Sequence, residues 1–178
     1  MFSLFSNLIS FFRFIGWYLL GGVRANLSSR IGPYSILRKA RHGAFICSGR
    51  ITARDSLRVY IEGKISIDGN VFFNSNVSIN CLDNISIGSD CLFGEQVKIY
   101  DHDHRYGMSV SVSTSGFTLA PVKIGNNVWV GSNVVILKGV TIGDNSVIAA
   151  GSVVNRDVPS NTLFYSGVRP KLKSVGAE

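Results

Sequence analysis

Aliphatic residues return at every sixth position along the C-terminal part of the chain. The first series is Ile124, Val130, Ile136, Ile142, Ile148 and Val154, and the second, four residues behind it, is Val128, Val134, Val140, Ser146, Ser152 and Val158. A helix repeats every 3.6 residues and a strand every two, so neither explains a period of six. A period of six with recurring glycines is typical of a hexapeptide β-helix, in which each hexad is one short strand and one turn.

The same period can be followed upstream, with one change of phase. It is carried first by Ile61, Ile67, Phe73 and Ile79, with companions Ile65, Val71 and Val77, and then by Ile87, Phe93 and Ile99, with companions Cys91 and Val97. It stops at Asp101 and resumes after Val122. A segment without the period must leave the coil, so residues 101–122 are predicted to form an extruded loop, and such loops often carry functional residues.

The first forty residues have a different character. Residues 1–58 hold nine Lys or Arg against one acid, Asp55, whereas the remainder holds nine against ten. The polar residues of the first helical segment would line one narrow face, with aromatic and aliphatic residues such as Phe12 and Trp17 around the rest. This pattern predicts an amphipathic helix with a basic flank, either at a membrane interface or packed on the coil; Arg13 argues against a bilayer-spanning helix.

Length and composition agree with one β-helix domain and its flanking segments. We predict residues 1–42 as a helical, membrane-interfacial segment, residues 43–165 as the β-helix domain with the loop 101–122, and residues 166–178 as a tail. The three cysteines have neither an even count nor a CxxC spacing, so reduced thiols in a cytoplasmic protein are expected. The chain lacks the pattern of a nucleic-acid-binding fold, and nucleic acid is not an expected partner.

The segment GNNVWVGSNVVILKGVTIGDNSVIAAGSVVNRDVPSNT resembles the C-terminal coils of the hexapeptide-repeat acyltransferases, in particular the sugar O-acetyltransferases of the galactoside and maltose acetyltransferase type. The resemblance covers about residues 61–165. It implies an all-β, left-handed parallel β-helix, a homotrimer, and acetyl-coenzyme A bound in a cleft between neighbouring subunits as the co-substrate, with no metal required.

The extruded loop begins with Tyr-Asp-His-Asp-His and holds two of the three histidines. Acyl transfer from a thioester to a hydroxyl needs a base, and neutral imidazole is suited to that at cytoplasmic pH. The resemblance implies His104 as the catalytic base, with His102 as the alternative and as an acceptor-binding residue. Asp101 and Asp103 are candidates for orienting the base, although adjacent acids in a loop are often simply solvated.

The resemblance also implies binding residues in the coil. Asn74 matches the family's acceptor-binding asparagine, although a turn asparagine at a coil corner explains it equally well. Ser132 and Ala150 match residues whose main-chain amides face the thioester carbonyl and the pantetheine arm. Trp129, at a corner where a small or polar residue is usual, is predicted to form a wall of the cleft for acceptor and cofactor. Arg156 is predicted to lie near the nucleotide phosphates.

These features predict an acetyl-coenzyme A-dependent O-acetyltransferase that acts on a sugar hydroxyl, free or lipid-linked, in bacterial surface polysaccharide biosynthesis at the inner face of the cytoplasmic membrane. A xenobiotic acetyltransferase, an amino-sugar N-acetyltransferase and a non-catalytic β-helix scaffold remain alternatives. A γ-type carbonic anhydrase needs three converging histidines, and His42, His102 and His104 do not supply that pattern. The acceptor sugar and its hydroxyl are not specified by the sequence.

Overall fold

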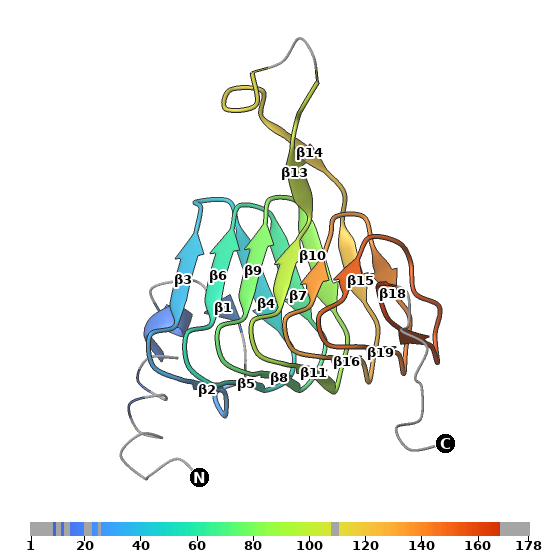
Figure 1. Ribbon diagram of the computed structural model, residues 1–178. Coiled ribbons are helices and arrows are strands. Elements are labelled where there is room, and N and C mark those ends of the chain that lie inside the picture. Colours follow the sequence, from blue (N-terminus) through green and yellow to red (C-terminus); the bar gives the residue numbers. More distant parts are fainter. Residues whose placement is uncertain are drawn as a thin grey trace, which may run out of the picture.

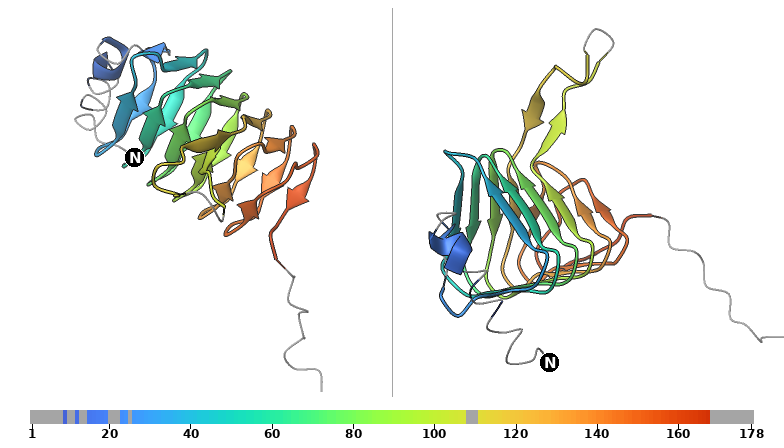
Figure 2. Two further views of the ribbon diagram at one scale, coloured as in Figure 1. Left: turned by 90° about the horizontal axis from the view of Figure 1, so that it is seen from above. Right: turned by 90° about the vertical axis from the view of Figure 1, so that its left-hand side faces the viewer.

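The computed structural model describes Ile9, Phe12, and residues 15–19, 23–24, 26–107 and 111–167. Within these residues the chain winds into a coil of triangular cross-section, built from three parallel sheets and one protruding hairpin (Figure 1, Figure 2). We name the three sheets face A, face B and face C, in the order in which each turn of the coil visits them. The predicted all-β parallel β-helix is therefore confirmed; its handedness stays a prediction.

Each face stacks strands from successive turns of the coil. Face A contains β1 (Val23–Arg24), β4 (Ala44–Cys47), β7 (Lys64–Ile67), β10 (Asn84–Ile87), β15 (Val122–Ile124) and β18 (Thr141–Ile142). Face B contains β2 (Arg30–Ile31), β5 (Ile51–Ala53), β8 (Val71–Phe73), β11 (Cys91–Phe93), β16 (Trp129–Val130), β19 (Val147–Ile148) and β21 (Leu163–Phe164). Face C contains β3 (Ile36–Lys39), β6 (Arg58–Ile61), β9 (Ser78–Cys81), β12 (Lys98–Tyr100), β17 (Val135–Ile136) and β20 (Val153–Val154).

The residues of the six-residue period point into the coil and form its core. Both predicted series are buried throughout, and Phe73 and Phe93, paired across β8 and β11, stack with ring centroids 5.0 Å apart. Ser146 and Ser152 are the polar members. Ser146 tolerates burial because its hydroxyl donates to the carbonyl of Pro159 at 2.8 Å and accepts from the amide of Thr162.

The coil begins earlier than the sequence pattern predicts. Strands β1, β2 and β3 lie before residue 43, and they pair in parallel with β4, β5 and β6. The predicted domain boundary between residues 42 and 43 is therefore wrong. The turns differ in length: Arg30 pairs with Thr52, 22 residues later, whereas Trp129 pairs with Val147, 18 residues later. Extra residues at the corners of the early turns break the sequence period without breaking the coil.

A helical segment at residues 15–19 lies beside the first strands (Figure 1, Figure 2). Trp17 packs against the buried core, whereas Phe12 and Leu19 are exposed by 62% and 71%. Part of the predicted amphipathic segment therefore belongs to the fold, while other large apolar side chains face outward. In the part of the chain that the structure describes, no helix has the length and apolarity needed to cross a bilayer. The apolar residues Phe2 and Phe5 lie outside the described residues.

Two corners of the prism matter for the site. The B–C corner is the column of turns at residues 54–57, 74–77, 94–97, 131–134 and 149–152. Its backbone is tied from turn to turn, because the amides of Asn76, Gln96, Asn133 and Gly151 donate to the carbonyls of Asp55, Ser75, Glu95 and Ser132. The C–A corner joins face C to face A, and the hairpin leaves the coil there, between β12 and β15.

Candidate active site

The predicted extruded loop is a hairpin whose two strands are β13 (His102–His104) and β14 (Phe117–Leu119). It stands away from the top of the coil at the C–A corner (Figure 1). The loop prediction is confirmed, except that Val122 already belongs to β15 and is buried. The strands pair His104 with Phe117 and His102 with Leu119. Both histidines therefore lie on one face of the hairpin, since side chains alternate along a strand.

His102 is oriented by a buried carboxylate at the root of the hairpin. Asp101 is fully buried, and its oxygens accept hydrogen bonds from the amides of Leu82 at 2.9 Å and Asp83 at 2.8 Å. The His102 Nδ1 atom lies 3.0 Å from Asp101 Oδ1. When Nδ1 carries the proton donated to Asp101, Nε2 is left as the acceptor. Asp101 thus orients the ring of His102, and not the ring of the predicted base, His104.

His104, the predicted base, is more exposed. Its ring packs against Phe117 with centroids 4.6 Å apart, and Phe117 also meets the edge of the His102 ring at 5.2 Å. Asp103 does not orient it, because Asp103 forms an ion pair with Lys138 at 3.1 Å. Among the described residues, no carboxylate contacts the His104 ring. A pocket of about 710 Å³ lies beside it, lined by residues that include Asp103, Arg105 and Lys138.

The predicted coil residues gather in another place, the B–C corner. Asn74, Glu95, Ser132 and Ala150 lie in four successive turns of that column. The Asn74 Nδ2 atom donates to Glu95 Oε1 at 2.5 Å, and the Ser132 hydroxyl donates to Glu95 Oε2 at 2.5 Å. These bonds hold the pKa of Glu95 below its usual range, the bond from Ser132 having the largest effect. The corner thus unites the predicted acceptor-binding and donor-binding residues.

Backbone amides are open at two turns of this corner. The amide of Ser75 donates to the Asn74 side chain at 2.9 Å, whereas the N–H groups of Ser132 and Ala150 have no hydrogen-bond partner among the described residues. Glycines keep these amides uncovered: a Cβ atom at Gly94 would lie 2.6 Å from the Ser132 nitrogen, and one at Gly131 would lie 2.6 Å from the Ala150 nitrogen. These N–H groups can therefore bind carbonyl oxygens of a ligand.

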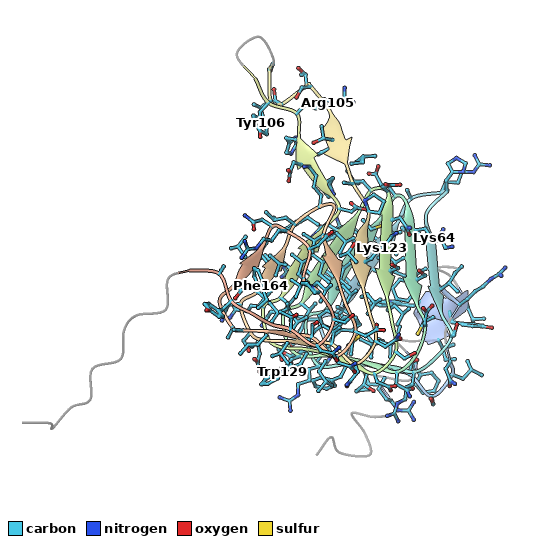
Figure 3. All side chains as sticks on the ribbon, turned by 90° about the vertical axis from the view of Figure 1, so that its right-hand side faces the viewer. Lys64, Arg105, Tyr106, Lys123, Trp129 and Phe164 are labelled. Carbon is cyan, nitrogen blue, oxygen red and sulfur yellow. The ribbon has the colours of Figure 1, made fainter. Side chains whose placement is uncertain are left out.

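Trp129 lies outside the core, on face B, with 56% of its side chain exposed (Figure 3). It belongs to an apolar column whose members occupy register positions on successive strands. The column consists of Phe72, Leu92, Trp129, Val147 and Leu163. Face B therefore presents a continuous apolar stripe next to the B–C corner, as expected for the wall of a cleft or for a contact between subunits.

Arg156 lies near the end of the described coil. Its guanidinium carbon is 5.7 Å from the centroid of the Phe164 ring, and both residues line a pocket of about 800 Å³. A cation at this place is compatible with the predicted phosphate contact. The other basic residues near the C-terminus, Arg169, Lys171 and Lys173, lie outside the described residues.

The histidines and the binding corner are not brought together within one chain. The hairpin rises from the C–A corner, while Asn74, Ser132 and Ala150 occupy the B–C corner, at the other edge of face C. Figure 3 shows Arg105 and Tyr106 of the hairpin on the opposite side of the coil from Trp129. The two sets of predicted residues therefore lie at different corners of the coil.

The described residues contain no cluster of three or more His, Cys, Asp or Glu placed to hold a metal ion. The three thiols are free and buried, and burial raises the pKa of Cys47, Cys81 and Cys91. A thiol is a nucleophile only as thiolate, so these cysteines are structural.

Sequence reasoning missed Glu95 as a site residue. The Phe-Gly-Glu segment gives no sign of its partners, since Asn74 and Ser132 are 21 and 37 residues away. Writing successive turns of the coil beneath one another would have placed Glu95 directly above Ser132 and Asn74 one position before them. That alignment can be made only when the length of the hairpin insertion between β12 and β15 is known.

Residues 121–156 match the family model described as bacterial transferase hexapeptide (six repeats). Over these residues the chain is similar to the hexapeptide-repeat transferases, and its coil of short parallel strands agrees with that likeness.

Two relatives and one solved structure illustrate the relationship. Galactoside O-acetyltransferase of Escherichia coli strain K12 is 40% identical over 99 residues, which cover 56% of this chain and 48% of that protein. A provisional lipopolysaccharide biosynthesis O-acetyl transferase of the same strain, WbbJ, is 36% identical over 124 residues, 65% and 63% of the two chains. The structure of a hexapeptide-repeat acetyltransferase from Vibrio cholerae O1 biovar eltor, complexed with acetyl coenzyme A, has 27% identity and a TM-score of 0.58, covering 84% and 70%.

The chain thus spans between about half and two thirds of the length of these two curated relatives.

Proposed function

We propose that this protein is an acetyl-coenzyme A-dependent O-acetyltransferase that modifies a sugar hydroxyl. The observation that carries the proposal is the pair of open amides at Ser132 and Ala150, in line with Asn74 on one rigid corner. The pantetheine arm of the donor is rich in amide carbonyls, and backbone N–H groups at fixed spacing suit it. The galactoside relative and the acetyl coenzyme A complex of the Vibrio structure support this choice of donor and acceptor.

Each residue has a distinct task in this reaction. The donor supplies an activated acetyl group as its thioester. His104 takes the proton of the acceptor hydroxyl during attack and returns it to the departing thiol. Asn74 hydrogen-bonds the acceptor, and the Ser132 amide donates to the carbonyl oxygen as negative charge develops there, a role worth about 10²- to 10³-fold in rate. Trp129 walls the cleft, and Arg156 lies toward the donor's phosphates.

The proposed catalyst is a homotrimer in which the hairpin of one subunit reaches the B–C corner of its neighbour. A base must come within about 3 Å of the proton that it removes. One chain holds His104 and Ser132 at different corners, so the complete site needs two subunits. The apolar stripe on face B, with Leu92 and Leu163 exposed by 52% and 54%, gives the neighbour a surface to cover.

We further propose that the acceptor belongs to the assembly of a bacterial surface polysaccharide at the inner face of the cytoplasmic membrane, with a lipid-linked saccharide as one form. Two observations support this. The relative WbbJ is named for lipopolysaccharide biosynthesis. Arg24 in β1, Arg38 in β3 and Arg41 in the turn after β3 are exposed, as are Phe12 and Leu19 of the N-terminal segment, and basic together with apolar residues suit an anionic lipid surface.

Replacing the proposed base tests this function. Because His104 would move the proton, His104→Ala is expected to lower kcat by about 10²- to 10⁴-fold while leaving the affinity for acetyl-coenzyme A unchanged. Thiol release with a panel of sugar acceptors measures the first quantity, and calorimetry measures the second. His102→Ala is the matched comparison and should have a much smaller effect. Equal turnover of wild type and His104→Ala would contradict the assignment of the base, and absence of turnover in the wild type would favour a scaffold without catalysis.

A further inference from the structure

Glu95 bridges the two halves of the proposed site. We propose that it is a positioning residue, which holds the acceptor-binding Asn74 and the donor-binding Ser132 in one arrangement. The proposal rests on the function proposed above. The Glu95 carboxylate lies in the turn that follows β11 and accepts hydrogen bonds from the turns on either side. Oε1 accepts from Asn74 and Oε2 accepts from Ser132, each at 2.5 Å. The three turns are thereby linked through side chains in addition to their backbone.

The bond from Asn74 fixes the direction of its amide. A carboxylate only accepts hydrogen bonds, so the NH₂ group of Asn74 must face Glu95. At the other end, Asn74 Oδ1 accepts from the amide of Ser75 at 2.9 Å. One N–H and one lone pair of Asn74 therefore remain for an acceptor hydroxyl, in known directions. Without Glu95 the side chain loses the contact that selects this orientation.

The bond from Ser132 has a corresponding effect on the donor side. Its hydroxyl proton is donated to Glu95, so the hydroxyl is held toward the preceding turn. The main-chain N–H of the same residue stays without a partner among the described residues and is available for the thioester carbonyl. Glu95 thus sets the acceptor-binding amide and the proposed oxyanion donor relative to each other, and proper placement of reacting groups is worth large factors in rate.

The carboxylate itself is a poor candidate for the base. Both oxygens are already engaged, by Asn74 and Ser132, and Arg54 also favours its charged form. The pKa of Glu95 lies below its usual range, mainly because of the Ser132 hydroxyl, and a carboxylate of low pKa binds protons weakly. A positioning role through its two neighbours is the one that the geometry supports.

A double-mutant cycle separates this role from direct contact with substrate. Glu95→Ala is expected to lower kcat/KM by about ten- to hundredfold, with an increased KM for the acceptor, because displaced groups lose much of their effect. In an Asn74→Ala/Ser132→Ala background, where the residues that it positions are already truncated, Glu95→Ala should add little. Independent, additive effects would overturn the proposal. Glu95→Gln should recover part of the loss, since its amide oxygen can still accept from Asn74.

The matched control is Asp55→Ala. Asp55 lies at the same corner and accepts a hydrogen bond from the Ser75 hydroxyl at 2.6 Å, so its removal deletes a bond of the same kind. Both alanine variants should lower Tm by similar amounts, but Asp55→Ala should leave kcat/KM within about twofold of wild type, as expected for a substitution that leaves the site intact. Equal losses of kcat/KM in the two variants would reduce Glu95 to a structural role.

A crystal structure of the Glu95→Ala trimer gives a result that does not depend on turnover. The side chains of Asn74 and Ser132 are expected to change rotamer. Unchanged rotamers would overturn the positioning role whatever the activity. If the wild type transfers acetyl to no sugar and the rotamers nevertheless change, the proposed function fails while the positioning role is supported.

Discussion

The coil and the segments outside its regular turns contribute different kinds of chemistry. At the B–C corner the coil presents main-chain N–H groups at Ser132 and Ala150, whose positions are fixed by the stacking of turns. The hairpin presents side chains, the imidazoles of His102 and His104, on a two-stranded extension. The described coil from residue 44 onward, outside the hairpin, contains no histidine, so the imidazole groups of the candidate site come from the hairpin.

The two regions also differ in how their polar groups are held. Asn74 and Ser132 are fixed by one carboxylate within the coil. His102 is fixed by the buried Asp101, whereas the ring of His104 meets Phe117 and no carboxylate among the described residues. The side chains of the proposed donor-binding corner are thus held within one chain, whereas the described residues bring no carboxylate to the proposed base. We expect the surroundings of His104 to be completed by the neighbouring subunit.

Mixing two inactive variants tests this comparison most strongly. His104→Ala subunits keep an intact corner, and subunits with Ala150→Trp keep an intact hairpin. If each site combines the corner of one subunit with the hairpin of the next, random equimolar mixing in cyclic trimers should restore about one quarter of wild-type activity. Sites built within one chain would restore none. Light scattering should show a trimer, near three times 19.3 kDa, in both variants and in the mixture.

The N-terminal segment is the second departure from the regular coil, and its deletion should change location without changing chemistry. Removal of residues 1–14 leaves Trp17 on the core and takes away the exposed Phe12. Sedimentation with anionic vesicles is expected to fall strongly, since apolar insertion and basic residues act together, and binding of the full chain should weaken with salt. Thiol release should be preserved. Full vesicle binding by the truncated protein would remove the membrane argument for a lipid-linked acceptor.

Covering one open amide should weaken donor binding by a smaller factor. A Cβ atom at Gly131 would lie 2.6 Å from the Ala150 nitrogen, so Gly131→Ala crowds that N–H. Loss of one hydrogen bond costs about 0.5–1.5 kcal/mol, roughly two- to tenfold in Kd for acetyl-coenzyme A by calorimetry. Gly125→Ala is the control, because its Cβ atom would crowd Asp144 at the A–B corner. It should lower Tm as well but leave Kd unchanged; a weakened Kd in both variants would argue against the amide.

The sequence predicted the parts of the fold that obey a local rule. Ile61 through Ile99, with one shift of two residues between Ile79 and Ile87, and Ile124 through Val158 repeat every six residues, and their burial was predictable from that period. The turns before Ile61 were missed because their corners contain extra residues, as the 22-residue step from Arg30 to Thr52 shows. A period identifies a coil only where the turns have one length.

The members of the candidate site were selected from the sequence in part for the same reason, and their roles stay predictions. Ser132, Ala150 and His104 stand in recognisable motifs, whereas the contacts of Glu95 depend on which turns become neighbours after the hairpin is inserted. The association of Asp101 with His102 also needed the structure, because the carboxylate is fixed by amides of Leu82 and Asp83 from the preceding turn.

The smallest expected effect concerns pH and the stability of the coil. Hydrogen bonds, first of all that from Ser132, lower the pKa of Glu95 in the folded state relative to about 4.3 in the unfolded chain. The folded protein therefore binds fewer protons, so the stabilisation is present above the unfolded pKa and is lost as pH falls through the lower folded pKa. Glu95→Gln should have a lower Tm than wild type near pH 6, and the difference should shrink below about pH 4.

Asp55 provides a second carboxylate of the same kind, since the Ser75 hydroxyl lowers its pKa. The double variant Asp55→Asn/Glu95→Gln should flatten the acid side of the Tm profile more than either single change. Calorimetry from pH 6 to pH 3 measures the profile. A difference in Tm that stays constant across this range would show that the hydrogen bonds at the B–C corner do not depend on the charge of these carboxylates. The proposed contrast, in which charged carboxylates hold the corner while a neighbouring subunit completes the surroundings of His104, would then be lost.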